Sequence, residues 1–239
     1  MIYQAIVKEL KEYSRSSKYK SHADEKDPAY KAYGIRKPAV VAIIKKHKKE
    51  ILALTLEEKI KLAEMLITSD MGEEQTISFF VLKNAIEYFS PKNLTLLSKY
   101  LKYFCGWSKI DEFTGSFVQE LLSKYPNEII EIVKKWNASP NMWARRASVV
   151  TFTRKAGASG KFTDVALKLC TNLVGNKEDM VQKGVGWCLK DLLKGDKKKV
   201  LNYVKALKRK DIPSIITLYA IRDLEGKDRQ QILNIKRIN

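Results

Sequence analysis

A tryptophan and an aspartate lie four positions apart in the string GWSKIDEFTGSFVQELLSK, residues 106–124. Helical spacing puts Trp107 and Asp111 one turn apart, beside an apolar stripe that runs from Ile110 to Leu121. An indole ring shields a nearby carboxylate from water, and such a carboxylate stabilises positive charge that develops during a reaction. The same spacing also fits a first-turn acid that favours the helix dipole, with the indole used for packing. From spacing alone, this second interpretation is the stronger prediction.

A second tryptophan lies on a lysine-rich face of a helix predicted over residues 177–194. The apolar stripe of that helix contains Val181, Gly184, Val185, Cys188, Leu189 and Leu192. On the opposite side, Trp187 lies among Lys183, Lys190 and Lys194. Because lysines bind phosphates and a flat ring stacks on a sugar or base, this face is typical of a nucleic-acid groove. The alternative is a second layer of helices that buries Trp187.

One arginine is predicted to lie in apolar surroundings, within the helical string SPNMWARRASVVTFTRK. The helical neighbours of Arg146 are Met142, Val149 and Val150. A cation in such a place needs an anionic partner, and either a phosphate or Asp111 would serve. A structural pair with another carboxylate is the alternative. Arg145 lies on a different face of the same helix.

Helices must position these residues, because nearly every segment has a helical period and strand alternation is scarce. Pro38 suits a first helical turn, and Thr55 followed by Glu58 has the spacing of a capping box. The polar stretch 14–34 is predicted to be irregular. The other predicted helices cover 2–13, 73–89, 91–103, 107–124, 126–137, 140–155, 162–174, 177–194, 196–208 and 211–223. The glycines expected near helix ends are Gly72, Gly157, Gly175 and Gly195.

Three strings resemble one another, each with a helix breaker, a polar start and a short apolar helix. They are SPKNLTLLSKYLKYF, KYPNEIIEIVKKW and KGDKKKVLNYVKALK. Each follows a longer helix, and this alternation is typical of helical-pair solenoids of the HEAT or armadillo type. We therefore predict an all-α fold, a single domain over residues 1–239. It would be a superhelical solenoid of HEAT-like antiparallel helix pairs with a basic concave face. An irregular helical bundle is the alternative.

The charge of the chain is strongly positive and unevenly distributed. The 239 residues carry a formal net charge of +18. Residues 1–50 hold 13 Lys and Arg against 6 Asp and Glu, and residues 141–210 hold 17 against 5. Residues 51–140 hold 10 against 12. Lysines that serve only solubility would be spread evenly along the chain. Basic residues that contact a phosphate backbone could instead be concentrated in parts of it.

Other features narrow the classes of function. None of the three cysteines is in a CxxC pair, and His22 and His47 lie far from them, so a zinc site is not expected. No P-loop, GxSxG or HExxH string occurs, and we expect no nucleotide, metal or flavin cofactor. The N-terminal segment lacks the apolar core of a signal peptide, and no apolar run reaches membrane-spanning length. We expect a cytoplasmic protein, associated with the nucleoid if the source is prokaryotic.

Three strings in order, GWSKIDEF, NMWARRASV and QKGVGWCLKD, resemble the AlkD-like family of DNA alkylation repair glycosylases. The early string YGIRKP also agrees with that family. The resemblance implies that Asp111 is the catalytic aspartate, Trp107 its partner, and Arg146 and Trp187 further active-site residues. It also implies an active enzyme. Lys190 stands where relatives have arginine, which keeps the charge but loses the planar fork. The residues expected to contact DNA are Lys183, Lys190, Lys194, Arg145 and Arg36.

The implied reaction is hydrolysis of the N-glycosidic bond of purines alkylated at N3 or N7 in duplex DNA. Such purines are already cationic, so they leave without a general acid, and one carboxylate can stabilise the oxocarbenium-like sugar. The family leaves the damaged base in the duplex, so no extrusion pocket is implied. We expect a monofunctional, monomeric enzyme. The alternatives are a catalytically silent DNA-binding scaffold, a protein–protein adaptor and an RNA-binding protein.

Overall fold

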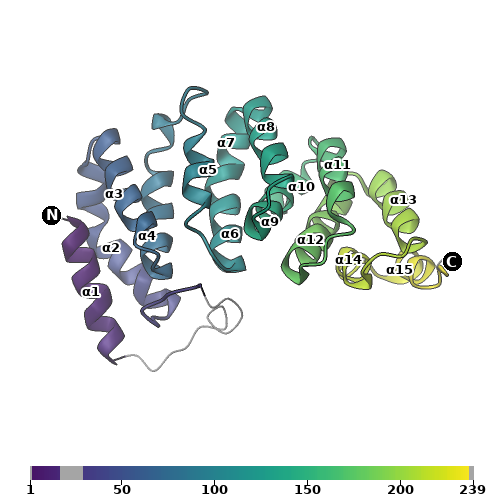
Figure 1. Cartoon of the computed structure of the whole chain (residues 1–239), viewed down its shortest axis with the longest axis horizontal. Helices are drawn as coiled ribbons and strands as arrows, with labels where there is room; N and C mark the ends of the chain where they lie inside the picture. The colour runs from purple at the N-terminus through teal and green to yellow at the C-terminus, as the bar shows by residue number, and fades with distance from the viewer. Residues whose placement is uncertain (1, 17–28, 237–239) are drawn as a thin grey trace. The chain divides into compact units, whose positions relative to one another are not determined.

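The computed structural model describes residues 2–16 and 29–236, and helices account for its regular structure (Figure 1). Within these residues no strand is present, and Lys31 and Met71 form an isolated backbone bridge. The all-α prediction is therefore confirmed. The chain divides into two compact units, Met1–Glu128 and Ile129–Asn239. No helix in the described part is long and apolar enough to cross a membrane.

Two helices of the first unit begin where the sequence predicts a helix start. Pro38 lies in the first turn of α2, and Thr55 caps α3. The Thr55 hydroxyl accepts a hydrogen bond from the Glu58 amide at 3.2 Å, and the Glu58 carboxylate accepts one from the Thr55 amide at 2.8 Å. The predicted capping box is confirmed. The elements are α1 (Ile2–Ser16), α2 (Lys37–Ala53), α3 (Leu56–Thr68), α4 (Gly72–Lys83), η1 (Ile86–Tyr88), α5 (Leu96–Leu101), α6 (Trp107–Phe113), η2 (Thr114–Val118) and α7 (Gln119–Lys124).

Phenylalanines form the part of the first core that holds α6 in place. The Phe104 and Phe113 ring centroids are 4.9 Å apart, and those of Phe89 and Phe117 are 5.0 Å apart. All four rings are almost fully buried. Because Phe113 and Phe117 belong to the helical run that begins at Trp107, this packing fixes the face that carries the tryptophan and the aspartate.

The predicted helix 107–124 is continuous but contains a π-helical segment, η2. The Thr114 hydroxyl donates a hydrogen bond to the Ile110 carbonyl at 2.8 Å, and the Ser116 hydroxyl bonds the Glu112 carbonyl. Side chains that bond carbonyls of the preceding turn compete with the regular helical ladder, and π segments occur where that ladder is locally widened. The widened turn lies directly after α6.

The second unit is built around α12 (Asp179–Gly195), which packs against α9, α10, α11, α13 and α14. Its predicted apolar stripe is buried, as expected. A Cβ atom at Gly186 would lie 2.6 Å from the Cβ of Tyr219, so glycine lets α14 pack closely. The other elements are α8 (Pro126–Asn137), which begins in the first unit, α9 (Met142–Val150), α10 (Arg154–Ala158), α11 (Thr163–Leu173), α13 (Lys197–Lys208), α14 (Ser214–Ala220) and α15 (Gly226–Leu233).

Several predicted elements differ from the structure. The helix expected over 140–155 ends at Val150, and an extended Thr153 precedes α10. Only Leu96–Leu101 of the segment 91–103 is regular α-helix. The helix α15 was not predicted. Part of the irregular stretch 14–34 is outside the described residues, and its first three residues belong to α1.

Two glycines expected near helix ends make close contacts. Gly72 begins α4, and a Cβ atom there would lie 2.2 Å from the hydroxyl oxygen of Tyr30. Gly157 lies within α10, where a Cβ atom would be 2.6 Å from the Phe152 carbonyl oxygen. Their lack of a side chain is therefore needed for close approach, and Gly157 is also the penultimate residue of α10, near a helix end as expected. The single domain, its superhelical winding and its basic concave face stay predictions.

Candidate functional site

The helix α6 begins at Trp107 because the preceding glycine allows a sharp turn. Gly106 has φ +77°, in the left-handed region that favours glycine. A Cβ atom at Gly106 would also lie 3.3 Å from Cδ2 of Tyr30. The chain therefore enters α6 against the Tyr30 ring, and this contact sets where the first residue of the helix lies.

Trp107 and Asp111 differ sharply in exposure. The Trp107 side chain is 40% exposed, whereas Asp111, one turn later, is 7% exposed. Trp107 is therefore not part of the buried core, and whether it packs or takes part in a reaction stays a prediction. Asp111 is the fifth residue of α6 and lies beyond its first turn, so the alternative of a first-turn acid is wrong. The helix α6 thus carries the exposed Trp107 ring one turn before the buried Asp111 carboxylate.

A buried lysine fixes α6 to α4. The Lys109 ammonium bonds the Thr76 hydroxyl and lies 3.7 Å from the Glu112 carboxylate. Burial lowers the pKa of Lys109, and the nearby carboxylate of Glu112 opposes that effect. Glu112 also lies 3.4 Å from the ammonium of Lys37 on α2. This network ties α6 to two neighbouring helices.

The string YGIRKP is fixed to the same unit by two acids of α4. The Glu73 carboxylate accepts hydrogen bonds from the backbone amides of Tyr33, at 2.9 Å, and Ile35, at 3.0 Å. The Tyr33 hydroxyl donates to Glu74 at 2.7 Å, and burial together with this bond raises the pKa of Tyr33. Arg36 follows as the exposed N-cap residue of α2.

In the second unit, Arg146 is buried, with 5% of its surface exposed. Its Nη1 donates a hydrogen bond to the Met180 carbonyl at 2.5 Å, near the start of α12. A Cβ atom at Gly184 would lie 3.4 Å from Cγ of Arg146, so glycine gives the arginine room against α12. A backbone carbonyl is thus one partner of this guanidinium.

Arg145 also points into the protein. Its Nη2 lies 2.7 Å from the Glu178 carboxylate, and its Nη1 donates to the Ser139 carbonyl at 2.5 Å. Because Glu178 is the residue just before α12 and Ser139 precedes α9, the Arg145 side chain links the starts of two helices. The guanidinium is therefore already engaged within the unit, and its role in DNA contact stays a prediction.

The lysines of α12 have acidic partners. Lys183 lies 2.6 Å from Asp179, Lys190 2.9 Å from Asp223, and Lys194 3.6 Å from Asp191. Lys194 is exposed, whereas Lys190 is buried. Burial acts to lower the pKa of Lys190, but the hydrogen bond with Asp223 and the charge of Asp191 outweigh it and raise that pKa. Helical spacing puts the three lysines on one side of α12, but Lys194 is accessible to solvent and Lys190 is not.

Trp187 is half-buried, and an arginine that sequence reasoning missed lies over its ring. The guanidinium carbon of Arg154 is 4.8 Å from the ring centroid. The backbone amide of Arg154 donates to the carboxylate of Asp191 at 2.7 Å. The sequence does contain a pattern that could have pointed to Asp191, because Trp187 and Asp191 are four positions apart, as are Trp107 and Asp111. No sequence pattern marked Arg154.

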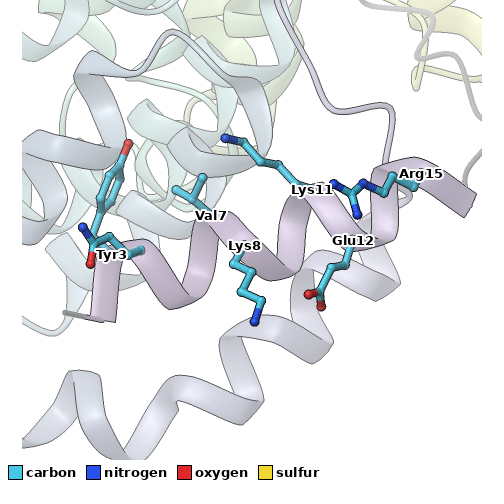
Figure 2. Close-up of a pocket in the computed structure, with 7 residues that line it drawn as sticks. Tyr3, Val7, Lys8, Lys11, Glu12 and Arg15 are labelled. Atoms are coloured by element: carbon cyan, nitrogen blue, oxygen red, sulfur yellow. The ribbon is translucent and has the colours of Figure 1, made fainter.

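A separate hollow of about 370 Å³ lies along α1 (Figure 2). Its lining comes from one helix: Tyr3, Gln4, Val7, Lys8, Lys11, Glu12 and Arg15. None of the predicted site residues lines it. Among the described residues, no group of three or more His, Cys, Asp and Glu side chains could hold a metal ion. His22 is outside the described residues.

Comparisons with known proteins agree on one family. A family model described as DNA alkylation repair enzyme matches residues 4–224. A solved structure from Enterococcus faecalis, described as a predicted DNA alkylation repair enzyme, has a TM-score of 0.70 at 16% identity. The alignment covers 93% of this chain and 96% of that one, so the two share a fold. No curated protein sequence matches. Since the family model spans nearly the whole chain, this protein belongs to the DNA alkylation repair enzyme family.

Proposed function

We propose that the protein is a monofunctional DNA glycosylase. Its substrates would be cationic N3- and N7-alkylated purines in duplex DNA, and its reaction would be hydrolysis of their N-glycosidic bond. Membership of the DNA alkylation repair enzyme family supports action on alkylated DNA. The observation that carries the finer proposal is the exposed Trp107 ring one helical turn before the buried Asp111 carboxylate.

The chemistry needs few protein groups. An alkylated purine carries a positive charge, so it departs as a neutral base without a proton from a general acid. The deoxyribose left behind has oxocarbenium character, and the carboxylate of Asp111 would stabilise it and orient the attacking water. The Trp107 ring, one helical turn before Asp111, would exclude bulk water from the sugar. Low exposure of Asp111 favours this role, because a carboxylate shielded from water interacts more strongly with a cation.

The basic residues would position the DNA backbone. Lys194 and Arg36 are exposed, so they are best placed to reach phosphates. Lys183, Lys190 and Arg145 have acidic partners at 2.6 to 2.9 Å, and a phosphate would share or replace those contacts. Arg146 would contribute charge from a buried position. We propose a monomer that acts without a cofactor, in the compartment that holds the DNA.

The test is release of free base from a duplex with a single N7-methylguanine, measured against the spontaneous loss without protein. A parallel duplex carries hypoxanthine, a neutral purine lesion. The proposal predicts release of N7-methylguanine, no release of hypoxanthine, and a strand that breaks only after alkali. Strand breaks without alkali would contradict the monofunctional mechanism.

The same experiment separates the rival functions. A catalytically silent DNA-binding scaffold would release neither base but would bind duplex DNA with strong salt dependence. A protein–protein adaptor would bind DNA weakly and with little dependence on salt. Either result would overturn the glycosylase proposal.

A further inference from the structure

The helix α2 carries most of its positive charge on its solvent side. Its sequence holds five lysines and one glutamate, and its buried face is formed by Val40, Ile43, His47 and Ile51. At about 100° per residue, Lys45 and Lys49 lie opposite that buried face. Lys48 lies on the flank of the helix that also carries Lys37. The outer side of α2 is therefore a row of lysines.

The acids near α2 are engaged on its other flank, against α1. The Glu9 carboxylate of α1 lies 2.8 Å from Nζ of Lys46 and 2.9 Å from Nε2 of His47. Glu50, the acid of α2 itself, lies 3.5 Å from Nδ1 of His47. These contacts neutralise charge where the two helices pack and place no carboxylate on the lysine row.

The outer lysines have no such compensation. Lys45, Lys48 and Lys49 are all exposed, and in the described part of the chain none of them belongs to an ion pair. Lys45 and Lys49 are four positions apart, a spacing at which like charges destabilise a helix. The row therefore does nothing for the stability of α2 and suits an external anion.

The lysine row begins beside α6. The ammonium of Lys37 lies 3.4 Å from the carboxylate of Glu112, the residue that directly follows Asp111. An α-helix rises about 1.5 Å per residue, so residues 37–49 span about 18 Å. That length corresponds to about five base pairs of duplex at roughly 3.4 Å each. A duplex that met Asp111 would bring neighbouring phosphates toward this row.

We propose that Lys45, Lys48 and Lys49 form a DNA-phosphate contact on the first unit, in addition to the basic residues of α9 and α12. The inference rests on the proposed function for the identity of the polyanion. It adds three residues that neither the sequence motifs nor the family resemblance marked. In this role the lysines hold the duplex beside α6 and take no part in bond cleavage.

The test uses the full chain with Lys45→Gln, Lys48→Gln and Lys49→Gln combined. Glutamine is a good helix former and removes the repulsion along the row, so the melting temperature should equal or exceed that of the wild type. Binding to an undamaged duplex is measured as a function of salt. Each phosphate contact contributes about 0.9 to the slope of log affinity against log salt, so the slope should fall by about two to three. Affinity at low salt should fall at least about tenfold.

A second triple variant removes the same charge elsewhere in the first unit. Lys61→Gln, Lys92→Gln and Lys102→Gln replace exposed lysines of α3 and of the segments that flank α5, and together they should lower the slope by less than about one. Single substitutions on α2 sharpen the comparison. Lys49→Gln should lower the slope by about one, whereas Lys46→Gln, on the flank paired with Glu9, should lower it less.

Equal slopes for the two triple variants would overturn the inference. They would leave the α2 row as a docking face for an acidic protein, which the exposed Val41 and Leu52 of α2 would also suit. At saturating protein, the α2 triple variant should release N7-methylguanine at the wild-type rate, and a slower release would contradict a role in binding alone. Failure of the proposed function looks different: the wild type would release no base, while the binding slopes would still report on the lysine row.

Discussion

A tryptophan and an aspartate one helical turn apart occur twice in the chain. The pairs are Trp107 with Asp111 and Trp187 with Asp191, and a glycine precedes each tryptophan. Both aspartates are buried, but their surroundings differ. Two lysine ammonium groups lie 3.4 and 3.6 Å from Asp191, so its charge is balanced within the protein. The Trp107 ring is also the more exposed of the two, and in the proposed function Asp111 is the acid that the cationic sugar would meet.

The glycine before Trp107 offers a test of how the first pair is positioned. Gly106→Ala would force a Cβ atom into a left-handed backbone and toward the Tyr30 ring. We expect a loss of about 1–2 kcal/mol in the free energy of unfolding, measured by urea denaturation. The proposed glycosylase activity should fall as well, because Trp107 is the next residue.

Gly175→Ala is the matched control for this change. A Cβ atom at Gly175 would meet nothing within 4 Å, and its φ is not in the left-handed region. It should alter the free energy of unfolding by less than about 0.5 kcal/mol. If the two variants unfolded at the same urea concentration, the left-handed turn at Gly106 would not be what fixes the start of α6.

Sequence spacing predicted some of these residues and missed others for physical reasons. It put Trp107 and Asp111 on one helix face, because helical period alone decides that. It gave Lys190 the same face as Lys194, but it could not foresee that Lys190 is buried and pairs with Asp223, which is distant in sequence. Arg154 was missed because a left-handed backbone at a non-glycine residue leaves no mark in the pattern.

At the scale of helices, α1 and α2 are joined by a charged cluster. The Glu9 carboxylate lies 2.8 Å from Nζ of Lys46 and 2.9 Å from Nε2 of the buried His47. Burial acts to raise the pKa of Glu9, but the hydrogen bonds from Lys46 and His47 outweigh it and lower the pKa below its usual 4.5. The cluster therefore favours the folded state only while Glu9 is ionised.

The sign of this shift predicts how stability depends on pH. A carboxylate with a lowered pKa stabilises the fold above its unfolded pKa of 4.5, and that contribution disappears as pH falls through the lower folded value. Glu9→Gln should therefore cost about 0.5–1 kcal/mol at pH 7 and less at about pH 3, because the contribution of the carboxylate charge shrinks once the pH is below 4.5. Melting temperatures of wild type and variant at both pH values measure it.

Glu12→Gln controls for the loss of one acid on the same helix. Glu12 is exposed, so the substitution should change the melting temperature little at either pH. A Glu9→Gln deficit that stayed the same from pH 7 to pH 3 would show that the carboxylate charge is not what links α1 to α2.

The helices themselves could be predicted where capping residues and apolar period agree. Pro38, Thr55 and Pro126 mark starts that the structure confirms. The segment 140–155 has an uninterrupted helical pattern, yet it breaks after Val150. Just after the break, the amide of Arg154 donates to the carboxylate of Asp191, a bond between residues 37 positions apart. Such long-range contacts override local periodicity.

Across the whole chain, charge is divided in a way that suits the proposed reaction. Residues 141–210 hold 17 basic and 5 acidic residues and include Arg146, Arg154 and Trp187. Residues 51–140 hold 10 basic and 12 acidic residues and include Trp107 and Asp111. A strongly basic segment favours phosphates, whereas a cationic transition state is better stabilised in a near-neutral segment with a buried carboxylate.

The all-α fold class could be predicted from the sequence. A helical period of apolar residues, short connections between helices and a scarcity of strand-like alternation all indicate it. The similarity to the Enterococcus faecalis structure at 16% identity fits this, since a helical scaffold depends more on the spacing of apolar residues than on their identity. The exposure of Trp107 and the ion pairs of the α12 lysines depend on tertiary packing, so a local sequence pattern could not predict them.

The single-turnover rate of N7-methylguanine release by Asp111→Asn tests the central claim most directly. Glu120→Gln, an exposed acid of the same helical run, is the matched control, and binding to undamaged duplex is measured on each variant. The account predicts a loss of at least about 100-fold for Asp111→Asn with duplex binding retained, and wild-type rates for Glu120→Gln. An Asp111→Asn protein that released the base at nearly the wild-type rate would contradict it.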